Sequence, residues 1–138
     1  APTDRNLEAP TGVFVDELGR STGLERPTLD ADQFLNAACS ILGVEIERLA
    51  SRRRDSETAS IRQLTAAVGI ERWGQRAGRI AAVLDKHPVA VSRWVAEVAG
   101  RRQKDRLIDE KMTKLDEALS RWALDAQARG ELSLRGDG

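Results

Sequence analysis

The residues of this sequence best suited to a chemical role are basic side chains. They have no obvious catalytic partners, so binding of an anion is the chemistry to consider. Arg52, Arg53 and Arg54 are adjacent. Three arginines in one loop can straddle phosphates or enter a narrow minor groove of DNA, where negative potential is focused. Asp55 and Glu57 follow directly, so a plain solvated loop fits the same residues.

The distribution of charge also favours polyanion binding. The chain has 22 basic and 22 acidic residues, but residues 48–106 hold fourteen basic and six acidic ones, a net charge of +8. Eighteen of the basic residues are Arg, whose planar guanidinium suits phosphate better than the Lys ammonium does. A basic block between acidic ends is typical of a face that binds nucleic acid, although an arginine-rich genome would give the same ratio.

The scarce residue types limit the other chemistries. A single Cys excludes an internal disulfide and a multi-cysteine metal site, and a single His nearly excludes a histidine zinc site. We therefore predict a protein that is not an enzyme and binds no cofactor or metal. The one enzyme hypothesis is a Cys39–His87 pair, which requires both residues to line one pocket. Otherwise Cys39 is expected to be a small buried hydrophobe.

We expect a reducing cytoplasm as the default compartment. No apolar run approaches the ~20 residues that a membrane span needs, and the first residues contain no signal-peptide core. The chain starts without Met, so we expect a fragment or a processed product.

Helical periodicity dominates from residue 29 to residue 130 and predicts an all-α fold, a helical bundle followed by a C-terminal amphipathic helix. Asp30 and Gln33 have the spacing of a capping box, and Gly43 is placed to close the first helix. The predicted helices that follow cover about 44–50, 57–70 (which Gly69 could end early), 75–84, 88–100 and 103–129.

The flanks look different. Residues 1–28 are acidic, contain three of the four prolines, and indicate an arm or linker. Within them, Val13–Val15 with Leu18 could dock as one turn or strand; no strand-like alternation is found elsewhere. Residues 131–138 are predicted to be a disordered tail.

The segment from Ile80 to Trp94 has the spacing of a helix-turn-helix. Ala81 is the small residue where two helices touch, and Asp85 can adopt the left-handed turn that glycine adopts more easily. Val91 is the buried anchor, and Pro88 is suited to open the second helix. Residues 87–93 of this recognition helix would enter a major groove. Two packed helices with no ligand fit the same spacing.

Two separated segments together resemble a known family. Leu49–Arg54, with Ala59, Arg62–Leu64 and Ala67, is similar to the basic loop and following helix of the DNA-binding domain of the bacterial replication initiator DnaA. Leu84–Arg93 resembles the Leu-Gly-Arg-Ser-Pro-Ser-Ala-Val-Ser-Arg pattern at the C-terminus of REP-associated tyrosine transposases, which carry a DnaA-like domain of the Trp-repressor class. The resemblance covers residues 29–99 and implies a nucleoid-associated domain that binds double-stranded DNA.

The chain also departs from these families. DnaA has Asp-His-Thr-Thr at the start of its recognition helix where this chain has His87–Ala90, so recognition of a DnaA box is not implied. There is no Walker loop, and the His pair and Tyr of the transposase nuclease are missing. The resemblance therefore implies binding without catalysis.

The same resemblance assigns roles to single residues. Arg52, Arg53 and Arg54 would lie at the DNA backbone or in the minor groove, and Arg62, Lys86 and His87 would contact phosphate. Val89, Ser92 and Arg93 would read base edges, with Val89 on a thymine methyl and Arg93 on a guanine. Arg93 could equally bind phosphate, and His87 could be a plain N-cap.

The C-terminal segment 101–130 offers a competing function. Its apolar stripe is Ile108, Met112, Leu115, Leu119, Trp122 and Ala126. The 103–129 helix could fold back on its own domain or form a homodimer. The chain could then be a protein-interaction module on a decayed helix-turn-helix, which Asp85, Asp55 and Glu57 favour. Trp73, Trp94 and Trp122 are predicted to be packing residues, although Trp73 could be partly exposed.

Overall fold

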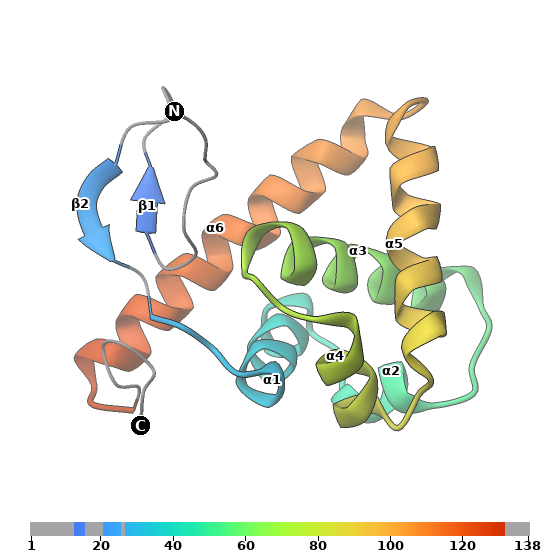
Figure 1. The fold of residues 1–138 in the computed structure, drawn as a ribbon, viewed down its shortest axis with the longest axis horizontal. Coiled ribbons are helices and arrows are strands. Elements are labelled where there is room, and N and C mark those ends of the chain that lie inside the picture. The colour runs from blue at the N-terminus through green and yellow to red at the C-terminus, as the bar shows by residue number, and fades with distance from the viewer. Residues whose placement is uncertain (1–12, 16–20, 26, 132–138) are drawn as a thin grey trace.

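Six helices make up most of the part of the chain that the structure describes (Figure 1). The computed structural model describes residues 13–15, 21–25 and 27–131. The predicted all-α fold is confirmed for residues 27–131, while most of the arm at 1–28 and the tail at 132–138 lie outside the described residues. The helices are α1 (Ala31–Leu42), α2 (Ile46–Ala50), α3 (Ser56–Arg72), α4 (Ala77–Leu84), α5 (Pro88–Arg102) and α6 (Arg106–Ala128).

Two short strands precede the helices. β1 (Val13–Val15) and β2 (Ser21–Glu25) pair antiparallel, with Val13 opposite Glu25 and Val15 opposite Ser21. A strand at 13–15 was one of the predicted options, but β2 was not expected. Its sequence, Ser-Thr-Gly-Leu-Glu, is too short and too polar to show the alternation that predicts a half-buried strand.

The helix ends follow their local signals. The Asp30 carboxylate accepts the Gln33 N–H at 2.8 Å, and the Gln33 side chain accepts the Asp30 N–H at 3.0 Å, so the predicted capping box is confirmed. Gly43 closes α1 with a left-handed φ of 73°. Asp85 closes α4 in the same way, with φ 55°, and is the one non-glycine residue in the described ranges with a positive φ. Pro88 is the first residue of α5.

Gly69 does not end α3, contrary to one predicted option. A β-carbon at residue 69 would lie 2.7 Å from Cε2 of Phe34, so the glycine allows α1 and α3 to pack closely. α5 also continues past Gly100 to Arg102, where a β-carbon would meet nothing within 4 Å. Close packing therefore requires a glycine at residue 69, whereas no neighbouring atom requires one at residue 100.

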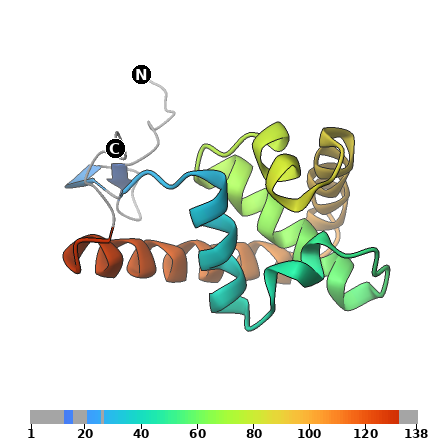
Figure 2. The same cartoon turned by 90° about the horizontal axis from the view of Figure 1, so that it is seen from below.

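α6 folds back on its own domain, which is the first of the two predicted arrangements. It packs against α1, α3 and α5, and Figure 2 shows it as one long rod that crosses α1. Met112, Leu115 and Leu119 are buried in the common core, and each contributes about 1.5–3 kcal/mol by leaving water. The stripe that would pair two copies is thus covered within one chain.

Polar contacts fix the position of α6. The Trp73 indole N–H donates to the Asp116 carboxylate at 2.8 Å, and only 5% of Trp73 is exposed. Trp73 is therefore a core residue that cannot stack on a base. The Arg102 guanidinium bridges Glu71 on α3 at 2.9 Å and Asp109 on α6 at 2.7 Å.

Candidate nucleic-acid interface

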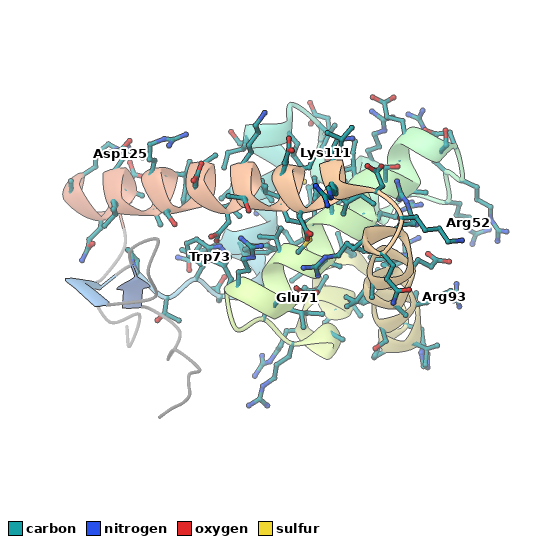
Figure 3. All side chains as sticks on the ribbon, turned by 90° about the horizontal axis from the view of Figure 1, so that it is seen from above. Arg52, Glu71, Trp73, Arg93, Lys111 and Asp125 are labelled. Atoms are coloured by element: carbon teal, nitrogen blue, oxygen red, sulfur yellow. The ribbon has the colours of Figure 1, made fainter. Side chains whose placement is uncertain are left out.

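The arginine loop (residues 51–55, between α2 and α3) lies beside the turn between α4 and α5 (residues 85–87). An open groove of about 630 Å³ is lined by residues of the loop, of α3, of the turn and of α5. In Figure 3, Arg52 of the loop and Arg93 of α5 project at the same edge of the molecule. Six cationic side chains line this groove, namely Arg52, Arg53, Arg54, Arg62, Lys86 and Arg93.

Three of these cations are available to an external anion. Arg52, Arg54 and Arg93 are exposed and make no hydrogen bond or ion pair with any residue in the described ranges. Arg53 differs, because its Nε donates to the Asp55 carboxylate at 2.9 Å. Its charge is therefore partly compensated before any ligand binds.

Arg62 is a buried structural residue, which corrects the expectation that it reaches a phosphate. Only 8% of it is exposed. Its guanidinium donates to the carbonyl oxygens of Leu49 at 3.0 Å, Arg53 at 2.6 Å and Ser51 at 2.7 Å. Its Cζ lies 5.8 Å from the centroid of the Trp94 ring on α5. The donors that would meet a phosphate are taken up by the main chain of the loop.

Lys86 contacts the same loop. Its Nζ donates to the Ser51 carbonyl oxygen at 2.7 Å, so Lys86 and Arg62 share one acceptor. Burial lowers the pKa of Lys86, and the nearby charges of Arg62 and Arg52 lower it further. An ammonium group has three N–H donors, so two of those on Lys86 remain for the groove.

The acidic residues beside the loop pair with residues other than Arg52 and Arg54. Asp55 is the N-cap of α3 and accepts the Thr58 N–H at 3.0 Å. This hydrogen bond is the main reason why the pKa of Asp55 lies well below its usual range, and the bond from Arg53 lowers it further. Glu57 pairs with Arg48 at 2.9 Å. The two carboxylates therefore do not neutralise Arg52 or Arg54.

The first turn of α5 presents a different surface. His87 is the N-cap, and its Nδ1 accepts the Val89 N–H at 3.2 Å, as one of its two predicted roles required. Val89 is 58% exposed, and among the large apolar side chains that the structure describes only Leu107, at 56%, is similarly exposed. Ser92 is exposed as well, and neither residue lines the groove, whereas Arg93 does.

Three polar or aromatic residues of the groove were not predicted from the sequence as site residues. Ser51 supplies the shared carbonyl, Trp94 covers Arg62, and Glu97 brings a carboxylate that accepts from the Gln63 amide at 3.1 Å. Lys86, Ala90, Arg93, Trp94 and Glu97 follow one another at helical spacing along the groove. A search for that stripe, starting from Lys86, would have found Trp94 and Glu97.

The Cys39–His87 hypothesis fails on placement. Cys39 is 3% exposed in the hydrophobic core, and burial raises the pKa of its thiol to about 11. His87 is exposed at the start of α5, so the two side chains do not face one pocket. Across residues 27–131 no cluster of three or more His, Cys, Asp or Glu side chains is arranged to hold a metal ion. Among the helices described, none is both long and apolar enough to cross a membrane.

Comparison with known proteins gives no further guide to this groove. No protein-family model, no curated protein and no solved structure matches the chain. The geometry of the loop and of α5 therefore has to carry the functional argument.

Proposed function

We propose that this domain binds double-stranded DNA without catalysis. In this proposal α4 and α5 act as a helix-turn-helix, and α5 is the recognition helix in the major groove. The observation that carries the proposal is the shared groove, into which the loop and α5 both direct arginines that have no partner in the described residues. Unpaired cations that converge from separate elements suit a polyanion of regular spacing.

The groove divides the contacts into two kinds. One sugar-phosphate strand separates the major groove of a duplex from the adjacent minor groove. If α5 lies in the major groove and the arginine loop reaches toward the minor groove, this strand must run between them, along the cationic groove. Arg93 is then assigned to a phosphate, because it lines the groove. Val89 and Ser92 are left to meet base edges.

The competing interaction-module hypothesis loses the features that favoured it. Asp85 adopts the left-handed conformation that the turn needs. Asp55 caps α3, and Glu57 pairs with Arg48. The stripe on α6 that would have joined two copies is buried. We infer a monomeric reader of DNA, located with the nucleoid in a bacterial cytoplasm.

A salt series tests this function. A labelled duplex is titrated with the native chain, with R54A/R93A and with R121A, an exposed arginine on α6 that does not line the groove. Fluorescence anisotropy should show that affinity falls steeply with salt. R54A/R93A should make the slope of log K against log salt shallower by about 2, because two phosphate contacts are lost. R121A should leave it unchanged.

Two results would count against the proposal. Failure of the native chain to bind any duplex at low salt would remove the function. Equal slopes for R54A/R93A and R121A would mean that binding is diffuse and does not use the groove.

A further inference from the structure

Arg62 and Lys86 meet in an arrangement that stability alone does not explain. Both donate to the Ser51 carbonyl oxygen at 2.7 Å, one from α3 and the other from the turn before α5. No carboxylate in the described residues makes an ion pair with either side chain. Carboxylates attract them only from beyond ion-pair distance, Asp55 acting on Arg62 and Asp85 on Lys86. A buried cation without a close counter-ion is costly, and a second cation at the same acceptor adds repulsion.

The arrangement does have a geometric effect. Arg62 holds the carbonyls of Leu49, Ser51 and Arg53, which are the main chain on which the exposed arginines are carried. Its guanidinium also lies near the ring of Trp94 on α5. Lys86 adds a bond from the turn. The loop is thereby tied to α3, to the turn and to α5.

We propose that Arg62 and Lys86 are positioning residues that lock the arginine loop to the recognition helix, so that both grip one DNA strand as a rigid unit. This inference rests on the proposed DNA binding. Arg62 itself touches no DNA, and its effect reaches the duplex through Arg52 and Arg54. A loop held in place before binding loses less conformational entropy when it binds.

The test separates positioning from a general loss of stability. R62K keeps the charge, but the three donors of an ammonium group radiate from one nitrogen. They cannot reproduce the planar fork whose three nitrogens reach the carbonyls of residues 48, 49, 51 and 53. Duplex affinity is measured for R62K, for R54A and for the double variant. R62K should weaken binding about tenfold, a loss typical of one good contact. In the R54A background the same change should cost less than about threefold, because one of the two arginines being positioned is gone. V89A is the control background, because Val89 lies outside the arginine loop. In V89A the R62K change should still weaken duplex binding about tenfold.

A second measurement needs no DNA. Hydrogen exchange of the free protein should speed up at residues 49–54 in R62K, while peptides from α1 and α6 keep their native protection. K86M removes both the donor to Ser51 and the repulsion, so its melting temperature should match or exceed that of the native chain. Its duplex affinity should fall, and should fall less in the R54A background than in the native one. If R62K fails to fold, the comparison of K86M in the native and R54A backgrounds replaces it.

The outcomes are distinct. A loss of affinity that shrinks in the R54A background supports the inference. Native affinity in R62K, or equal losses in the R54A and V89A backgrounds, overturns the inference and leaves the proposed function intact. If the native chain binds no duplex at all, the proposed function and this inference both fall.

Discussion

The ring of Phe34 fills the space that a side chain at residue 69 would need, with its Cε2 and Cζ atoms 2.7 Å and 2.9 Å from the position of an added β-carbon at Gly69. Phe34 is fully buried and contacts the Trp73 ring at a centroid distance of 6.4 Å, so it has little room to move. G69A should therefore lower the free energy of unfolding by about 1–3 kcal/mol through overpacking. Urea denaturation followed by circular dichroism measures this.

The matched control for G69A is G100A on α5. Nothing lies within 4 Å of an added β-carbon there. Alanine is the better helix former, so G100A should raise stability by up to about 1 kcal/mol. If both variants were stabilised, the close contact between α1 and α3 would be wrong.

The turn before α5 gives a prediction of stability. Asp85 has a φ of 55°, a conformation that costs most residues with a β-carbon about 1–2 kcal/mol. D85G should stabilise the domain by up to about 1 kcal/mol, and D85A should destabilise it by a similar amount. Thermal unfolding of the three proteins should rank them Gly, Asp, Ala. A D85A variant as stable as D85G would show that the turn is not left-handed.

The depressed pKa of Asp55 leads to a prediction of how the stability of the fold depends on pH. Its folded-state pKa is depressed, so its carboxylate stabilises the fold above the ordinary Asp pKa of about 3.9, and this contribution is lost as the pH falls below that value. D55N keeps a good N-cap but cannot titrate. The melting temperature of the native chain should fall more steeply than that of D55N between about pH 5 and pH 2. Parallel curves would contradict the placement of Asp55.

The burial of Cys39, the one cysteine of the sequence, leads to a prediction of its reactivity. The thiol is buried and its pKa is raised to about 11, so little thiolate forms at neutral pH and reagents cannot reach it. A chromogenic disulfide reagent should react with the unfolded chain in urea and only very slowly with the folded one. Fast reaction of the folded protein would mean that Cys39 is accessible, and the hypothesis of a nucleophilic cysteine would return.

The exposed side chain of Val89 leads to a prediction about which bases the proposed DNA-binding domain prefers. Selection from a pool of randomised duplexes should yield a preferred site, and V89A should relax the preference at one thymine by about 1 kcal/mol. Its salt slope should stay native, because Val89 carries no charge. A shallower slope in V89A would place the residue at the backbone through a change in docking.

Signals that act within one helical turn were readable in the sequence. The Asp30–Gln33 box, Pro88 at the start of α5 and the left-handed Asp85 each depend on residues a few positions apart. The stripe of α6 was readable too, because its spacing shows which face is apolar. Which partner covers that face depends on three-dimensional packing, so the sequence left folding back and pairing open.

Contacts between distant segments could not be read in this way. The family resemblance assigned Arg62 to phosphate, and the sequence could not contradict it, because an arginine looks the same whether it binds phosphate or holds a loop. Its role became visible when the carbonyls of residues 49–53 were placed around it. Gly69 looked like a helix end because its reason for being glycine lies on another helix.

The way α6 is built into the core determines how the domain can be divided. Ile108, Met112, Leu115 and Leu119 share one core cluster with Phe34 and Val68, and Arg102 joins the α5–α6 junction to α3. A fragment that stopped at residue 100 would expose this core and should not fold. It would nevertheless contain every residue that lines the cationic groove, together with Val89 and Ser92. The smallest transplantable module therefore extends through α6, and a fusion protein designed around it must carry a helix that lines no part of the cationic groove.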